Sequence, residues 1–102
     1  MRKIEKEMIN AINEGSEMCK QNTSVINLVC RGVIYVRLYD TIIFARKNGK
    51  AYFSDGGKAT AATASRLRAL GANYHIEQGK GILEGAKLLT QPEMINIIFP
   101  YK

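Results

Sequence analysis

The first residues of the chain alternate apolar and charged positions with the period of an α-helix. Four apolar residues recur at spacings that place them on one face, while charged residues fill the opposite face. These apolar residues are Ile4, Met8, Ala11 and Ile12. Gly15 is suited to end the helix, because glycine readily adopts the left-handed conformation of a C-cap. The pattern predicts an amphipathic helix over residues 2–14 and a polar connector over residues 16–22.

The next part of the chain is rich in valine, isoleucine and leucine and is divided by turn signals. Asn48-Gly49 is the strongest signal, because Asn-Gly favours the positive φ angles of a type I′ hairpin turn. Arg31-Gly32 and Tyr39-Asp40 mark two further turns. The pattern predicts an antiparallel meander whose strands cover residues 24–30, 33–38, 41–47 and 50–54.

A second helix is expected after a break at Asp55-Gly56-Gly57. Thr60 can cap this helix by accepting a hydrogen bond from the backbone N–H of Thr63, and the helix is expected to run to Leu70. The remaining pattern predicts a strand over 73–78, a turn over 78–81, and a returning strand over 82–84 or 86–89. A final strand is expected over 94–99, bounded by Pro92 and Pro100.

Together these elements predict an α+β fold in a single domain, residues 1–102. Its antiparallel sheet of about five to six strands would pack against the N-terminal helix and the helix at about 60–70. The apolar fraction of 46% and the charged fraction of 24% are typical of globular proteins. No apolar run approaches the roughly 20 residues of a membrane helix, and the N-terminus does not resemble a signal peptide. We therefore expect no membrane association and a cytoplasmic location.

The net charge of +6 is concentrated in the middle of the chain. Residues 23–70 contain only two acidic residues, Asp40 and Asp55, whereas the segments on either side are each balanced. The eight basic residues of this segment are Arg31, Arg37, Arg46, Lys47, Lys50, Lys58, Arg66 and Arg68. Such an excess points to an anionic partner, with nucleic acid as the first choice, or else serves the solubility of a small protein.

One face of the predicted meander combines aromatic rings with arginines. If the strands pair through their turns, Tyr35, Phe44 and Phe53 form a cross-strand row. Arg37 and Arg46 would lie beside the row, which could stack unpaired bases while the guanidinium groups meet phosphates. Alternatively the rings belong to the core and the arginines reach past it to water. A shift of one residue in register would move every side chain to the other face.

The Gly-Gly turn before the second helix is a candidate anion site, because backbone N–H groups at a helix start attract negative charge. Lys58, Thr60, Thr63 and Arg66 could add side-chain contacts to a phosphate, although the spacing of a P-loop is absent. The alternative is a helix cap with a tight turn. In that case Arg66 would pair with a carboxylate such as Asp55.

The sequence does not predict an active site. His75 is the single histidine, and Asp40 and Asp55 are too few for two-metal chemistry. Cys19 and Cys30 are expected to be thiols, with a disulfide between them left open, and together with His75 they do not make up a zinc site. We therefore expect no enzymatic activity, no metal and no cofactor.

Three stretches of the chain resemble a widespread family of small phage proteins that also open with a short helix. These stretches are residues 22–25, 36–45 and 56–70. The most specific part is a threonine-rich helix start that leads into Ser-Arg-Leu-x-Ala-Leu at residues 65–70. The chain departs from the family where Lys58 replaces a tryptophan, where Tyr39-Asp40 replaces His-Gly, and where Arg68 replaces asparagine. The resemblance implies an origin in a phage or mobile element and supplies no chemistry.

The resulting hypothesis is a non-enzymatic phage accessory protein that binds DNA or RNA in the cytoplasm of an infected bacterial host. The expected contacts are Arg37, Arg46, Lys47, Lys50, Lys58, Thr60, Thr63 and Arg66, with Tyr35, Phe44 and Phe53 for stacking. One alternative is a protein inhibitor of a host nucleoprotein machine, such as a CRISPR or other defence complex. Another alternative is a homodimeric interaction module that uses a sheet face or an edge strand.

Overall fold

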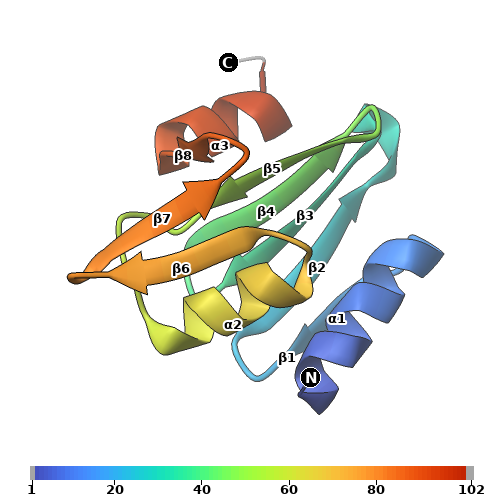
Figure 1. Cartoon of the computed structure of the whole chain (residues 1–102). Helices are drawn as coiled ribbons and strands as arrows, with labels where there is room; N and C mark the ends of the chain where they lie inside the picture. The colour runs from blue at the N-terminus through green and yellow to red at the C-terminus, as the bar shows by residue number, and fades with distance from the viewer. Residues whose placement is uncertain (1, 101–102) are drawn as a thin grey trace.

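The computed structural model describes residues 2–100, which form an α+β fold (Figure 1). The α-helices are α1 (Lys3–Glu14), α2 (Ala61–Ala69) and α3 (Gln91–Ile98). The strands are β1 (Met18–Lys20), β2 (Thr23–Leu28), β3 (Val33–Leu38), β4 (Thr41–Lys47), β5 (Lys50–Ser54), β6 (Asn73–Glu77), β7 (Lys80–Glu84) and β8 (Leu88–Leu89). A short 3₁₀ turn, η1 (Val29–Arg31), connects β2 to β3.

Six of these strands form one sheet in the order β1-β2-β3-β4-β5-β8. Neighbouring strands are antiparallel except β5 and β8, which run parallel and pair over two residues. β6 and β7 form a separate two-stranded hairpin. The predicted Asn48-Gly49 turn is confirmed, because both residues have positive φ angles and join β4 to β5.

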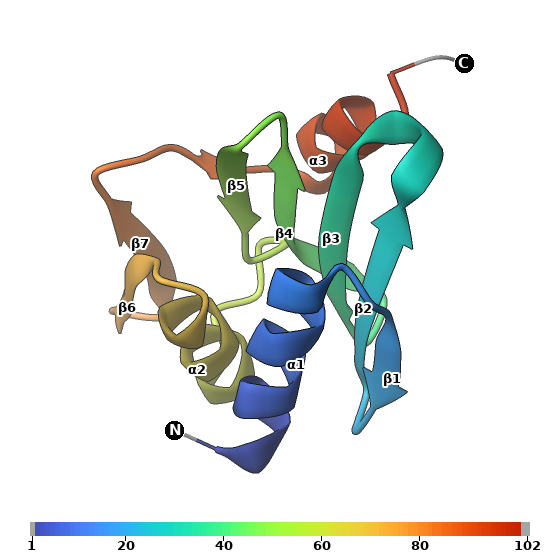
Figure 2. The same cartoon turned by 90° about the vertical axis from the view of Figure 1, so that its right-hand side faces the viewer.

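Helices cover the sheet from both sides (Figure 2). α1 and α2 pack on one face, where Met8, Val36 and Leu67 belong to one fully buried cluster. α3 packs on the other face, where Met94 and Ile98 contact Val33 and Ala45 in a second buried cluster. No helix in residues 2–100 has both the length and the apolar character needed to cross a membrane.

Two helix boundaries that the local sequence predicts, the end of α1 and the start of α2, are confirmed. α1 ends at Gly15, whose φ of 70° lies in the left-handed region, as the C-cap prediction requires. α2 begins after Thr60, whose side chain accepts a hydrogen bond from the backbone N–H of Thr63.

The predicted final strand over residues 94–99 is wrong, because this segment lies in helix α3. Thr90 and Glu93 form a reciprocal capping box, in which each side chain bonds the other residue's backbone N–H. Pro92 stands in the first turn, where proline favours a helix rather than bounding a strand. Met94 and Ile98, four residues apart, then face the sheet together.

Smaller differences concern strand ends. The predicted strand over 24–30 stops at Leu28, because the chain turns into η1. The expected polar connector contains strand β1. Both candidate return segments form strands, as β7 and β8, rather than one of the two.

The register between β3 and β4 differs from the prediction by one residue over most of its length. Arg37 pairs with Ile42 but Val36 pairs with Phe44, so Ile43 has no partner and forms a β-bulge. Beyond the bulge Tyr35 lies opposite Ala45, not Phe44. Because side-chain direction alternates along a strand, this single insertion places Tyr35 on the α3 face of the sheet.

A buried hydrogen bond fixes the β6–β7 hairpin against the end of β5. The Tyr74 hydroxyl donates to Asp55 Oδ2 at 2.7 Å, and the two residues are only 2% and 5% exposed. Burial, the hydrogen bond and the charge of Asp55 together raise the pKa of Tyr74 well above its ordinary value of 10.0. The phenol therefore stays protonated in the folded chain at pH values where it ionises in the unfolded chain.

This raised pKa predicts a loss of stability in alkali. A group whose folded-state pKa is raised contributes stability that is present below pH 10 and is lost as the pH rises above it, by about 1.4 kcal/mol per pH unit. Tyr74→Phe should remove this alkaline dependence, while costing roughly 1–3 kcal/mol at neutral pH because Asp55 loses a donor. Urea unfolding at several pH values checks both effects. The control is Tyr39→Phe, at a ring that is 65% exposed, which should leave the fall of stability with pH unchanged. If the stability of the unchanged chain and that of Tyr74→Phe fell equally with pH, the raised pKa of Tyr74 would be contradicted.

Candidate functional site

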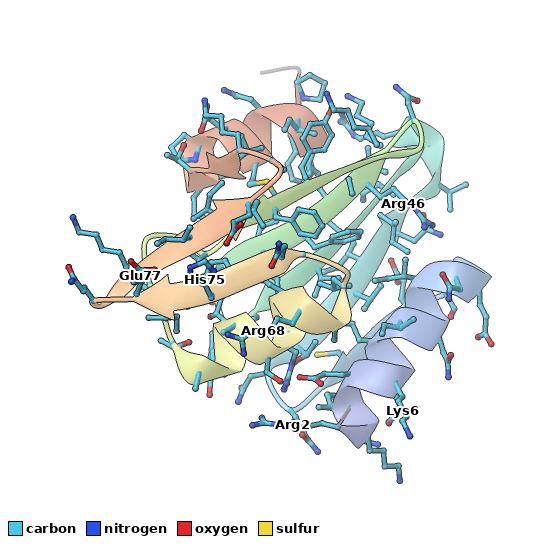
Figure 3. The ribbon with its side chains drawn as sticks, viewed as in Figure 1. Arg2, Lys6, Arg46, Arg68, His75 and Glu77 are labelled. Carbon is cyan, nitrogen blue, oxygen red and sulfur yellow. The ribbon has the colours of Figure 1, made fainter. Side chains whose placement is uncertain are left out.

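The basic residues of the central segment divide between the two ends of the sheet. Lys47 and Lys50 pair across the β4–β5 turn, and Val33, just beyond η1, pairs with Lys47. We call the four cations at this end, Arg31, Arg46, Lys47 and Lys50, the basic sheet end (Figure 3 labels Arg46). Arg37 and Lys58 lie toward the opposite end, roughly 20 Å away along β4.

Arg46 and Lys47 each stabilise the C-terminus of a different helix. As neighbours on a strand they point to opposite faces of the sheet. Arg46 Nη2 donates to the carbonyl oxygen of Ile12 in α1 at 3.4 Å, and Lys47 Nζ donates to the carbonyl oxygen of Ile97 in α3 at 3.1 Å. Neither helix has a basic residue in its own last turn, so β4 supplies the positive charge that the helix dipole favours there.

Arg31 and Lys50 lie over aromatic rings at the same end. Arg31 Cζ is 5.6 Å from the centre of the Phe99 ring, and Lys50 Nζ is 5.4 Å from the centre of the Tyr52 ring. Both cations are exposed and both rings are partly exposed. This arrangement keeps the charged groups at the surface and allows the rings to attract them.

The charge of the basic sheet end is not neutralised by carboxylates. Among the described residues, ion pairs join Lys20 to Glu7 and Lys87 to Glu93, but none involves the four cations of this end. Their contacts with carbonyl oxygens and rings leave the formal charge in place. Among the described residues, none of the four cations of this end therefore has a carboxylate within ion-pair distance.

Arg66 is not part of any exposed surface. Its guanidinium Nη1 lies 3.0 Å from Glu5 Oε2, and its Nε donates to Thr23 Oγ1 at 3.2 Å. Ser65 donates a further hydrogen bond to Glu5. The expected pairing of Arg66 with a carboxylate is confirmed, but the partner is Glu5 of α1 rather than Asp55. Arg66 thus joins α1, α2 and β2 inside the protein.

The Gly-Gly turn uses its backbone N–H groups internally. Gly56 N–H donates to Ser54 Oγ at 3.1 Å, and Gly57 N–H donates to Asp55 Oδ1 at 2.9 Å. Thr63 is buried, and its hydroxyl accepts a hydrogen bond from the hydroxyl of Thr60. The structure thus matches the alternative of a cap with a tight turn. Of the residues expected there, Lys58 and Thr60 stay exposed, beside a cavity of about 140 Å³.

The predicted row of three rings is wrong, because the β-bulge divides it between two faces. Phe44 and Phe53 do pair, with ring centres 5.6 Å apart, but Phe44 is 5% exposed beneath the helices. Tyr35 lies on the opposite face, edge-on to Phe99 at 6.3 Å. The alternative that these rings belong to the core is the better description of Phe44.

Comparison with known proteins supplies the family. The family model described as Kyanoviridae Gp96 protein matches residues 1–91. The chain belongs to the Kyanoviridae Gp96 protein family. This confirms the expectation of a phage protein family. Neither a curated protein nor a solved structure matches the chain.

The Gp96 match spans the strands β1 to β8 of the described residues, and with them the four cations of the basic sheet end. It ends at Gln91, the first residue of α3, so that Phe99 lies beyond the matched range. Sequence reasoning counted Arg31 among the basic residues but did not name it as a contact, and it missed Tyr52 and Phe99. The alternation along β5 could have indicated Tyr52, whereas Phe99 depended on recognising α3 as a helix.

The two cysteines and the histidine of the described residues are not part of a metal-ligand cluster. Cys19 and Cys30 are free and exposed. His75 lies between two carboxylates on the β6–β7 hairpin, with Nε2 3.4 Å from Glu77 and Nδ1 3.6 Å from Glu84. Figure 3 labels His75 and Glu77. Within residues 2–100, no three such groups are placed to hold a metal ion.

Proposed function

We propose that this member of the Gp96 family is a non-enzymatic protein that binds nucleic acid through the basic sheet end. The observation that carries the proposal is the convergence of Arg31, Arg46, Lys47 and Lys50 from two neighbouring connections without carboxylate partners. Sequence-independent binding to nucleic acid depends mainly on such uncompensated lysines and arginines, because each contact with a phosphate releases condensed counterions.

The positions of the cations suit a curved phosphate backbone. Arg46 and Lys47 point to opposite faces of the sheet, so the charge is spread around its end rather than along one face. Arg31 and Lys50 are exposed beside them. Contacts of this kind would position a strand on the protein without reading its bases.

Salt dependence of binding tests the proposal. Affinity for a fluorescent 20-nucleotide probe should fall linearly on a log–log scale with salt, with a slope of about −0.7 to −0.9 per phosphate contacted. Arg31→Ala combined with Lys50→Ala should make this slope shallower by roughly 1.4–1.8. The charge-matched control is Arg37→Ala combined with Lys58→Ala at the opposite end of the sheet, which should leave the slope unchanged.

Two results would count against this function. Absence of binding to DNA and RNA at low salt would remove it. Equal effects of the two double variants would show that only the overall net charge matters and that the basic sheet end is not the site.

A protein partner is the second candidate, favoured by Val29. This residue is 78% exposed in η1, directly before Cys30 and Arg31. Arginine beside an exposed apolar side chain is typical of protein interfaces. A pull-down from nuclease-treated host lysate tests this candidate. The Val29→Ser variant should no longer capture the protein that the unchanged chain captures. If both capture it equally, a protein partner at Val29 is contradicted. Two forms of protein partner remain predictions: a host defence complex that the protein inhibits, and a second copy of the chain in a homodimer.

A further inference from the structure

Two partly exposed aromatic rings lie among the cations of the basic sheet end. Tyr52 is on the α3 face of β5, under the ammonium group of Lys50. Phe99 follows the last turn of α3, under the guanidinium group of Arg31. Neither ring is part of the row predicted from sequence.

The packing of α3 explains why the two rings reach the surface. Ala45, which is fully buried, pairs with Tyr35 on one side and Tyr52 on the other. The small side chain of Ala45 lets α3 approach the sheet, and the larger residues flank the helix. Phe99 leans edge-on against Tyr35, and Lys47 holds the end of α3 through Ile97. Both rings are therefore held in place by the fold.

We infer that the nucleic acid bound at this end is single-stranded, with unpaired bases stacking on Tyr52 and Phe99. This inference rests on the proposed function and names the class of its partner. Arg31, Lys47 and Lys50 would contact phosphates on either side of the stacked bases. A base that stacks on either ring would displace the cation that now lies over it, and the displaced Arg31 or Lys50 can then contact the adjacent phosphate.

A duplex fits this arrangement less well. In a duplex the faces of the bases are hidden by stacking, so rings on a protein surface cannot reach them without unpairing the strands. The phosphates of a duplex would still meet the cations. Stacking therefore distinguishes the two forms of nucleic acid, and the cations alone do not.

The other rings of the described chain do not offer the same site. Phe44 is buried beneath α1 and α2. Tyr39 is the most exposed ring, but it lies at the opposite end of the sheet, next to Asp40. Its distance from the basic sheet end makes Tyr39 a useful control.

Three probes of equal length test the inference: a single strand of thymidines, a duplex, and a single strand without bases. At one salt concentration the thymidine strand should bind about tenfold or more tightly than the baseless strand, because each stacked base adds to binding. Tyr52→Ala should weaken binding of the thymidine strand by about tenfold. It should leave binding of the baseless strand within about twofold, because the phosphate contacts remain.

Two further variants separate stacking from a loss of structure. Tyr52→Phe keeps the ring and should bind the thymidine strand as the unchanged chain does. Tyr39→Asn removes an exposed ring at the far end, and asparagine suits the positive φ of 55° at that position, so its binding should also be unchanged.

The outcomes distinguish this inference from the function on which it rests. If the thymidine and baseless strands bind equally, stacking is overturned while binding to phosphates stands. If the duplex binds more tightly than the thymidine strand, the assignment to single strands is overturned. If no probe binds, the proposed function itself fails.

Discussion

Arg66→Ala is expected to lower the free energy of unfolding by about 3–5 kcal/mol, because it leaves a buried carboxylate without its cation. Glu5 is 3% exposed and accepts hydrogen bonds from Ser65, Arg66 and the backbone N–H of Arg2. Removing the guanidinium also removes the hydrogen bond that the Thr23 hydroxyl accepts from Arg66 Nε. The loss should appear in urea unfolding as a lower midpoint.

Two variants give this prediction its controls. Arg68→Ala, two residues away on the exposed side of α2, removes the same charge and one hydrogen bond to Tyr74, and should cost only about 1 kcal/mol. Replacing both partners, as Glu5→Leu with Arg66→Met, should recover much of the loss, because apolar side chains of similar volume can take the place of a buried pair. A cost below about 1 kcal/mol for Arg66→Ala would contradict the role given to this pair.

The same pair predicts an effect of acid. Burial alone would raise the pKa of Glu5, but the hydrogen bonds from Ser65, Arg2 and Arg66, with the charge of Arg66, lower it below its ordinary value of 4.5. A lowered pKa in the folded state contributes stability that is present above pH 4.5 and is lost as the pH falls below it. The double variant should lack this contribution and lose less stability in acid than the unchanged chain.

Gly81→Ala is expected to cost roughly 3 kcal/mol or more, because it forces a side chain into a filled space. A Cβ at Gly81 would lie 2.1 Å from Tyr74 Oη and 2.2 Å from Asp55 Oδ2. Those are the two atoms of the buried hydrogen bond between β6 and the end of β5. Either β7 moves away from them, which disturbs its pairing with β6, or the hydrogen bond breaks, which leaves Asp55 Oδ2 buried without its donor.

The matched control for this steric effect is Gly79→Ala in the turn of the same hairpin. Gly79 has a φ of 75° and nothing near its missing side chain, so its substitution adds only backbone strain, of about 1 kcal/mol. Thermal unfolding of the two variants compares the effects directly. If Gly81→Ala lowers the free energy of unfolding no more than Gly79→Ala does, the close approach of β7 to Tyr74 is contradicted.

Local signals in the sequence predicted the elements whose ends depend on a few neighbouring residues. Gly15 and Thr60 define helix boundaries through their own backbone and side chain, and Asn48-Gly49 defines a hairpin turn. The same type of signal was present at Thr90 and Glu93, where a capping box starts α3. The isoleucine-rich residues after Pro92 also fit a strand, and a short apolar run does not distinguish a strand from a helix.

Features that depend on distant residues could not be predicted in the same way. The bulge at Ile43 has no local signal, yet it decides which face Tyr35 occupies. The partner of Arg66 is 61 positions away in the chain, so spacing could not identify Glu5. The candidate site was predicted in part: Arg46, Lys47 and Lys50 do gather, but Arg37 and Lys58 lie at the other end of the sheet.

The most direct test of nucleic-acid binding at the basic sheet end is a map of backbone amide resonances during titration with a short oligonucleotide. Binding at the basic sheet end predicts that the largest shifts fall in residues 29–33 and 46–52 and around Phe99, and that they shrink as salt is added. Shifts centred instead on residues 37–41 and 56–63, or spread evenly over the chain, would contradict the claim.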